Sequence, residues 1–334
     1  MNSAQLRKEI DGSEYFSKEV LNWITKQNLW NLWVPKSHGG LEKSFSDGLK
    51  KLQSLARIDG SLSWTVTLCS GANYFVGILQ PDLAAEIFKS SKRPIFGGSG
   101  GPFGTAEIKD GKYELEGTWK YATGAPYLTH FTLNAIITQN GIPVKDNQGA
   151  DKILSFVLAK DQVKIIEDWN TMGLLATATC SFEVKKVLLS ERYSFFYDKF
   201  FLDQDIFKIP FPVFADLTLW VNYIGIIEHY LDEAGKHLSK NQLDKLVSLV
   251  EKSNQEKEYY ADQVELALKN NQTIEKKLKK DLHDTAAELI GDCSQAITAI
   301  HPFLGMKAAR KNHPLNRIFC DYFTATQHHN FVDR

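Results

Sequence analysis

The stretch Pro94–Tyr127, PIFGGSGGPFGTAEIKDGKYELEGTWKYATGAPY, decides the fold class of this chain. It opens with five glycines, at positions 97, 98, 100, 101 and 104, and continues with alternating apolar and polar residues. Gly98-x-Gly100 lacks the third glycine of a dinucleotide-binding fingerprint, and no helical pattern follows it. The glycines therefore predict a plain loop, or a segment whose backbone closely approaches something flat.

The residues after the glycines predict a sheet. Glu107–Gly117 alternates around Asp110-Gly111, which is the signature of a β-hairpin with a tight turn. Further segments up to about residue 190 alternate or run apolar, and turns such as Asn140-Gly141 separate them. Because no helical pattern lies between these segments, we expect a mostly antiparallel sheet, closed as a barrel or packed as a sandwich.

Both flanks of this region show helical periodicity. On the N-terminal side, apolar spacing predicts helices from Ser13, from Asp47 as an N-cap, and over Ser61–Leu79. On the C-terminal side, helical patterns begin near Phe211, Lys245, Glu275 and Pro314. The predicted class is therefore α+β, in three domains: an N-terminal helical domain over 1–92, an antiparallel β-barrel over 93–192, and a C-terminal four-helix bundle over 193–334.

Composition excludes several classes of function. The chain has 334 residues, 43% of them hydrophobic, and a formal net charge of -1, so no basic excess attracts nucleic acid. We expect no membrane-spanning segment, because no apolar run is long enough, and no secretory signal. The histidines show no metal-binding spacing. Four separated cysteines, without any CxxC motif, predict reduced thiols in a cytoplasmic protein: Cys69, Cys180, Cys293 and Cys320.

Four motifs in order carry a resemblance to a known family. Leu32-Trp-Val-Pro-Lys-Ser-His-Gly-Gly-Leu41 and Leu55–Ser61 lie in the first domain, and Gly117–Gly124 and Met172–Thr179 lie in the second. The chain resembles the acyl-CoA dehydrogenase superfamily over essentially its full length. That resemblance implies the same three-domain architecture, a bound flavin, and assembly as a homodimer or homotetramer.

Within that superfamily, the details resemble the two-component flavin monooxygenases. The segment Gly101–Ala106, the motif Trp119-x-x-x-Thr123-Gly124 and the terminal Pro314–Arg317 with the later Asp321 and His328 are similar to that branch. The resemblance implies FAD or FMN as cofactor, a small organic substrate and a separate flavin reductase. The implied catalytic residues are His328 or His329, with Thr123, and the implied cofactor-binding residues are Trp119, Thr123, Gly124, Met172, Gly173, Thr177, Thr179 and Arg317.

Two other functions stay open at this stage. An acyl-CoA dehydrogenase needs a carboxylate base, but the chain has no Glu after Glu288, and Asp216 is the one candidate near the start of the long core helix. Asp216 is also explained as a helix-start residue stabilised by the helix dipole. The third reading is a catalytically silent binding or scaffold protein.

Several motif residues also have plain structural explanations. Trp119 alone is typical of a core, and Thr177 and Thr179 fit strand alternation. Arg317 fits a cap or an ion pair within the bundle. The run Lys276–Lys280 is most simply a solvated helix face.

Overall fold

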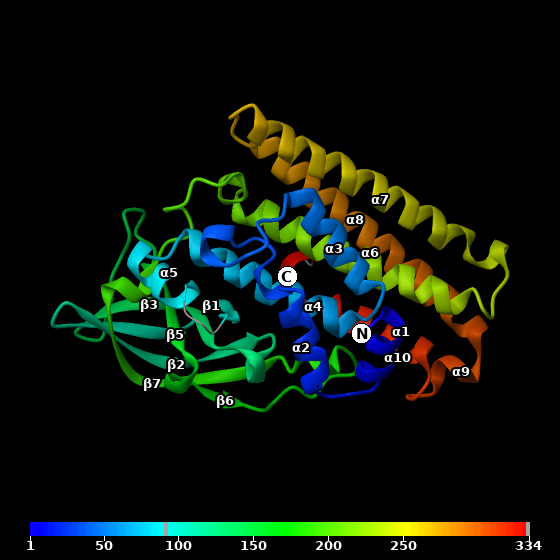
Figure 1. The fold of residues 1–334 in the computed structure, drawn as a ribbon, viewed down its shortest axis with the longest axis horizontal. Helices are drawn as coiled ribbons and strands as arrows, with labels where there is room; N and C mark the ends of the chain where they lie inside the picture. Colours follow the sequence, from blue (N-terminus) through cyan, green and yellow to red (C-terminus); the bar gives the residue numbers. More distant parts are fainter. Residues whose placement is uncertain (90–92, 332–334) are drawn as a thin grey trace.

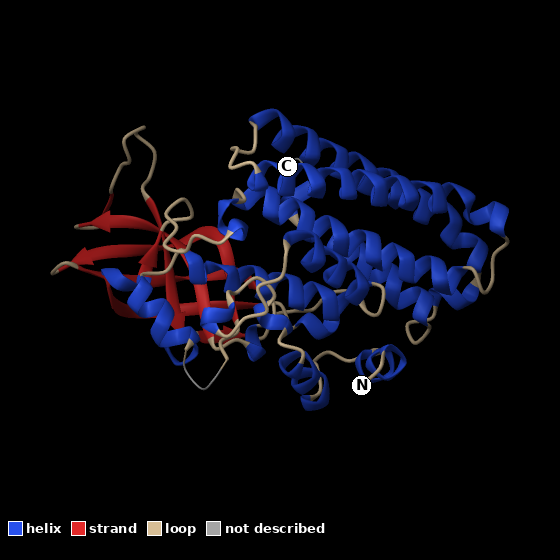
Figure 2. Cartoon of the chain, turned by 45° about the horizontal axis from the view of Figure 1, so that its top comes forward, coloured by secondary structure: helices blue, strands red, loops and turns tan. Residues whose placement is uncertain are grey.

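The computed structural model describes residues 1–89 and 93–331. Its elements follow the expected order of helices, sheet and helices, with the sheet at one end of the molecule (Figures 1 and 2). The predicted domain boundary at residue 92 and the last three residues of the predicted third domain lie outside the described residues. The division into 1–92, 93–192 and 193–334 therefore stays a prediction.

The N-terminal helices differ from the prediction at their starts. Ser17 caps the second helix by accepting a hydrogen bond from the Val20 amide, so this helix starts later than Ser13. The predicted cap Asp47 is wrong, because its own amide donates to the Ser44 hydroxyl at 3.2 Å. The helices are α1 (Ser3–Ile10), α2 (Lys18–Lys26), α3 (Phe45–Ala56), α4 (Gly60–Asn73) and α5 (Pro81–Phe88), with 3-10 turns at Leu29–Asn31, Lys36–His38 and Tyr74–Gly77.

The helix α4 is the central element of the molecule. Its N-cap carboxylate, on Asp59, accepts a hydrogen bond from the Leu62 amide at 2.8 Å. The helix ends at Asn73, before the predicted end at Leu79. Nearly all of its residues are buried, because it packs against the sheet on one side and the C-terminal helices on another. It therefore lies where the sheet meets the helical part.

Within the described residues, eight strands form one open sheet in the order β6-β7-β2-β1-β3-β5-β8, with β4 paired to β3. The predicted closed barrel is wrong, because β6 pairs with β7 alone and β8 pairs with β5 alone among the described strands. The strands are β1 (Phe96–Lys109), β2 (Lys112–Ala122), β3 (His130–Gln139), β4 (Ile142–Pro143), β5 (Ile153–Ala159), β6 (Lys164–Ile166), β7 (Cys180–Ser190) and β8 (Ser194–Phe195).

The centre of the sheet corrects a second expectation. The hairpin is confirmed: β1 and β2 are antiparallel, and both Asp110 and Gly111 have positive φ in the turn. However, β1 and β3 are parallel, so the sheet is not purely antiparallel. After β2 returns along one side of β1, the chain crosses to the other side of β1, and β3 then runs in the direction of β1.

The glycine-rich stretch lies in β1 and is not a loop. The register with β3 shifts between Ser99 and Gly104. A Cβ on Gly98 would overlap the Thr132 backbone, and a Cβ on Gly104 would overlap the Trp119 ring. The reading of close backbone approach is therefore correct at these two positions.

The C-terminal part is less regular than the predicted four-helix bundle. Three long helices lie side by side, α6 (Phe211–Ala234), α7 (Lys240–Lys269) and α8 (Lys276–Ile300), while α9 (Met306–Ala309) and α10 (Pro314–Ala325) are short (Figure 1). Helix α10 packs on α6, and so does α3 from the N-terminal part. These two helices have the same length, 12 residues, so both parts of the chain contribute to the packing around α6.

One further prediction concerns membranes. Among residues 1–89 and 93–331, no helix combines the length and the apolar character that crossing a bilayer requires.

Candidate functional site

Helix α4 contacts two groups of predicted residues through adjacent positions, Trp64 and Thr65, which form a corner of the helix surface. Successive residues of a helix point about 100° apart, so Trp64 and Thr65 face different neighbours. The Trp64 ring meets the His328 ring edge-on at a centroid distance of 5.6 Å. A Cβ built on Gly124, whose φ is +73°, would lie 3.3 Å from Thr65 Cγ2 and from Cys69 Sγ, so this turn approaches α4 closely.

The two adjacent histidines have different surroundings. His328 is half-buried, and burial lowers its pKa to about 4, with a smaller contribution from the neighbouring His329. His329 is exposed, and its ring stacks on His328 at 4.7 Å. The Asn330 amide donates to His328 Nδ1 at 3.4 Å. At neutral pH the imidazole is therefore uncharged and carries its proton on Nε2.

Three of the predicted threonines form one hydrogen-bonded chain. Thr177 Oγ1 lies 2.8 Å from Thr179 Oγ1, and Thr179 Oγ1 donates to Thr123 Oγ1 at 3.2 Å. The Gly124 amide donates to the Thr177 carbonyl at 2.8 Å, which fixes the turn beside the chain. Thr177 Oγ1 also donates to the Leu174 carbonyl at 2.7 Å, so the three hydroxyls and this carbonyl form one buried network.

Trp119 lies apart from this corner, in the interior of the sheet. Its indole N–H donates to the Asn134 carbonyl at 2.7 Å, and its ring stacks on Phe182 with an interplanar angle of 14°. It has no exposed surface, and Gly104 and Gly117 cover its ring. The structure therefore does not bring Trp119 to a surface that a ligand could touch.

Tyr121 is the exposed aromatic side chain of this motif, and sequence reasoning missed it. It is 44% exposed and meets Trp169 at 5.9 Å. Strict alternation would place Tyr121 on the same face as Trp119. The register of β2 with β7 is irregular between Trp119 and Ala122, which breaks that alternation. The local pattern gave no signal of this irregularity.

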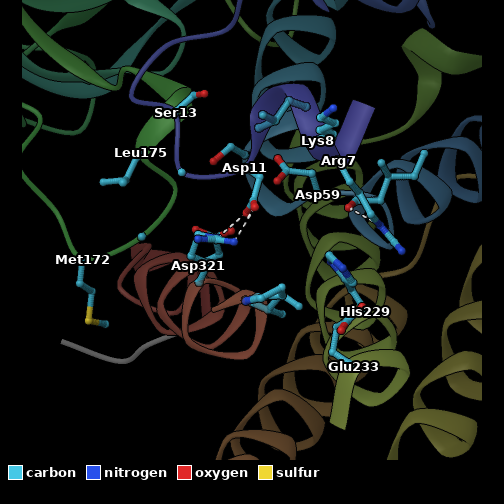
Figure 3. Close-up of a pocket in the computed structure, with 18 residues that line it drawn as sticks. Arg7, Lys8, Asp11, Ser13, Asp59, Met172, Leu175, His229, Glu233 and Asp321 are labelled. Carbon is cyan, nitrogen blue, oxygen red and sulfur yellow. Dashed lines mark hydrogen bonds and ion pairs between the residues drawn. The ribbon is translucent and has the colours of Figure 1, made fainter. Parts of the chain in front are cut away.

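Met172, Gly173 and Arg317 line a pocket of about 270 Å³ between α1, α4, α6 and α10 (Figure 3). A Cβ on Gly173 would overlap the Cys320 backbone, so this loop rests directly on α10. Arg317 forms an ion pair with Asp11, the C-cap residue of α1. Its guanidinium is therefore already engaged within the chain.

Two carboxyl groups lie in the same pocket. Figure 3 shows Asp59 and Asp321 close to each other, beside Asp11. Asp321 accepts a hydrogen bond from the Leu174 amide at 2.5 Å. Burial raises the pKa of both carboxyls, and the charge of Asp59 raises the pKa of Asp321 further. The pair thus holds a proton more readily than isolated carboxylates do.

Asp216 is not the helix-start residue that the sequence suggested. The first turn of α6 contains no acidic residue. Asp216 lies beyond this turn and is buried. Asn330 donates to its carboxylate at 2.7 Å, and His283 Nδ1 lies 3.2 Å from it. It therefore ties the start of α6 to the segment that carries His328.

The predicted residues thus fall into four places. His328 contacts one side of α4, and the Gly124 turn, with Thr123, Thr177 and Thr179, lies against another. Met172, Gly173 and Arg317 line the pocket beside α10, and Trp119 lies inside the sheet. The arrangement places a neutral imidazole and a buried hydroxyl network against one helix.

Comparison of the fold defines the class of proteins that this chain resembles. The HsaA monooxygenase from M. tuberculosis superposes with a TM-score of 0.87 at 16% identity, over 98% of this chain and 92% of that chain. XiaF from Streptomyces sp., in complex with FADH2 and glycerol, gives 0.88 at 16%, over 98% and 89%. The TdsC complex from Paenibacillus sp. with FMN and indole gives 0.78 at 17%, over 98% and 91%. These proteins share the fold of this chain.

Sequence comparison narrows the resemblance. The indole-3-acetate monooxygenase of Pseudomonas putida is 30% identical over 226 residues, which are 67% of this chain and 56% of that protein. The enzyme of the same name from Acinetobacter baumannii is 27% identical over 68% of this chain and 57% of its own length. The chain thus spans little more than half the length of the curated relatives it matches. No protein-family model matches the chain.

Proposed function

We propose that this chain is a flavin-dependent oxidoreductase, the oxygenase component of a reduced-flavin monooxygenase acting on a small organic substrate. The observation that carries the proposal is the uncharged imidazole of His328, packed on Trp64 at the helix that also meets the Thr123–Gly124 turn. The 30% identity to an indole-3-acetate monooxygenase and the fold shared with the HsaA monooxygenase support it.

The residues present suit a flavin, FAD or FMN. Thr123 ends the buried hydroxyl chain, where it would hydrogen-bond the ring, and the exposed Tyr121 and Met172 would supply apolar surface for it. The position of Thr123 would be fixed by the hydroxyls of Thr179 and Thr177 and by the Gly124 turn. Gly173 would fix the loop that carries Met172, and the buried Trp119 would support the interior of the sheet. When bound, the reduced flavin supplies the electrons that activate dioxygen.

His328 would act as a hydrogen-bond donor in the reaction. Its Nε2–H can donate to an oxygen atom of dioxygen or of the substrate, while Nδ1 accepts from the Asn330 backbone amide. His329, which is exposed, would assist less directly. Arg317, held by Asp11, would orient α10 under the Met172–Gly173 loop.

The wider setting belongs to the same proposal. A separate flavin reductase would supply the reduced flavin, and the chain would assemble as a homodimer or homotetramer. All four cysteines are free thiols, which supports the expected cytoplasmic location.

Reconstitution tests the proposal. The purified chain is incubated with FAD or FMN, desalted, reduced by light, and mixed with oxygen and indole-3-acetate as the probe substrate. We expect a yellow protein whose reduced form consumes oxygen and transfers one oxygen atom to the substrate, followed by mass spectrometry. A protein that stays colourless with both flavins would support the silent scaffold and reject the enzyme.

A dehydrogenase is the second candidate, and Asp216 favours it. This buried carboxylate lines a pocket, and burial raises its pKa, as suits a base that must accept a proton. Bleaching of the bound flavin by an acyl-CoA thioester without oxygen would establish this activity instead.

A further inference from the structure

A second pocket, of about 410 Å³, lies between the first turns of α6 and α8 and the end of the described chain. Three lysines and a histidine line it, together with two aspartates. The residues around it are Pro212, Val213, Asp216, Lys276, Lys279, Lys280, His283, Asp284 and Asn330.

The lysines reach this pocket from one face of α8. Lys276, Lys279 and Lys280 are spaced three and four residues apart, so they share a face, while Lys277 does not line the pocket. The run Lys276–Lys280, which the sequence suggested to be a solvated helix face, therefore lies only partly outside the pocket. Three of its lysines surround a concave space, and one does not.

These lysines occupy an unfavourable end of the helix. Helix N-termini carry partial positive charge, which repels cations and attracts anions. The N-cap residue Glu275 makes no side-chain capping bond, and the first turn contains no acidic residue. Within α8 the carboxylate of Asp284 offsets the charge of Lys280. The remaining lysines at this end of the helix are a local conflict, and such conflicts are expected at functional sites.

The acidic groups of the pocket are already engaged. Lys280 pairs with Asp284, and Asp216 is held by Asn330 and His283. Over residues 1–89 and 93–331, neither Lys276 nor Lys279 is recorded in an ion pair. The positive charge of these two side chains is therefore available to a ligand.

We propose that this pocket binds the carboxylate or phosphate group of a small molecule, with Lys276 and Lys279 as the charged contacts. Carboxylate and phosphate oxygens accept charge-assisted hydrogen bonds from ammonium groups and from free helix amides. Asn330, in the wall of the pocket, donates its amide to His328, so the anion would lie beside the turn that carries the imidazole. The proposal does not depend on the flavin chemistry.

Two variants with the same loss of charge test the site. Lys279→Gln removes a lining ammonium, and Lys277→Gln removes its neighbour outside the pocket. Titration calorimetry of the full chain is carried out at constant ionic strength, because salt screens all the lysines alike. We expect Lys279→Gln to raise the Kd for inorganic phosphate about tenfold, and Lys277→Gln to change it less than twofold.

Three pairs of probes identify the source of the anion. Indole-3-acetate is compared with indole, FMN with riboflavin, and inorganic phosphate with chloride. Binding of the charged member alone, weakened by Lys279→Gln, supports the site and names its ligand class. Absence of binding for all three charged probes overturns the proposal, and so does an equal effect of both variants. Because FMN would also bind the proposed flavin site, only binding that Lys279→Gln weakens and Lys277→Gln does not is assigned to this pocket.

Discussion

At the residue scale, the histidine doublet shows how two identical side chains are separated by their surroundings. His328 packs on Trp64, and burial keeps it uncharged, while His329 is exposed. The sequence contained both imidazoles but no pattern that distinguished them. That difference arises from the turn after α10, which places one ring against α4.

A pair of substitutions tests this assignment. His328→Asn removes the positioned proton and should lower the rate of substrate oxygenation by about 10²–10⁴-fold. His329→Asn should retain most of the activity, because its ring faces water. Product formation and oxygen uptake are measured together on both variants, loaded with the same flavin. Equal losses in the two variants would remove His328 from its proposed role.

Asp321 leads to a pH-dependent prediction. Its folded pKa is raised, so the folded state binds its proton more tightly than the unfolded state does. This group therefore destabilises the fold increasingly as pH rises above the unfolded pKa of about 4. Asp321→Asn mimics the protonated form and can still accept from the Leu174 amide.

We expect Asp321→Asn to raise the melting temperature at pH 9 by about 2–4 °C, roughly 1 kcal/mol. The gain should shrink progressively toward pH 5, where the natural side chain is itself protonated. Thermal unfolding followed by circular dichroism at several pH values measures it. A gain that is constant with pH would show that ionisation of Asp321 is not the cause.

Two other residues show where local patterns are insufficient. Trp119 was a candidate wall of the cofactor site, but the break in register places Tyr121 at the surface and leaves Trp119 inside the sheet. Asp216 was explained by the helix dipole, but it lies beyond the first turn. The surroundings of each side chain depend on residues far away in the sequence, which a short stretch of sequence does not contain.

At the element scale, the Met172–Gly173 loop depends on direct backbone contact with α10. A Cβ at position 173 would overlap the Cys320 backbone, which cannot move as a flexible side chain can. Gly173→Ala should therefore destabilise the protein by about 1–3 kcal/mol, measured by urea unfolding. It should also weaken the hydrogen bond between the Leu174 amide and Asp321.

Gly291→Ala provides the matched control. Gly291 is exposed within α8, and a Cβ there meets nothing within 4 Å. Because alanine restricts the unfolded chain and favours helix, this change should stabilise the protein by about 0.5–1 kcal/mol. A stabilising effect of Gly173→Ala would contradict the close contact.

The same scale shows what the sequence predicts of the sheet. The Asp110-Gly111 turn was predictable because a two-residue turn of this kind specifies a hairpin locally. Closure of the sheet was not predictable, because alternation marks the faces of a strand and says nothing about which strands form the edges. The parallel pairing of β1 with β3 was hidden for the same reason.

At the scale of the whole molecule, the order of helices, sheet and helices was predictable from the change of period along the chain. The composition of the bundle was not, since α3 joins α6 from a distant part of the sequence. Helical periodicity shows that a face is buried, but it does not identify the partner of that face.

The proposed function also predicts the source of electrons. A separate flavin reductase would supply the reduced flavin, so the flavin-loaded chain should consume no oxygen with NADH alone. A flavin reductase or photoreduced flavin should restore oxygen uptake, measured with an oxygen electrode. Direct oxidation of NADH by the chain would contradict this.

Helix α4 supplies both sides of the corner where Trp64 meets His328 and Thr65 meets the Thr123–Gly124 turn. Adjacent positions on one helix keep a constant angular offset, whatever the bundle does relative to the sheet. Motion of the C-terminal helices relative to the sheet would therefore leave the angle between the Trp64 and Thr65 side chains unchanged.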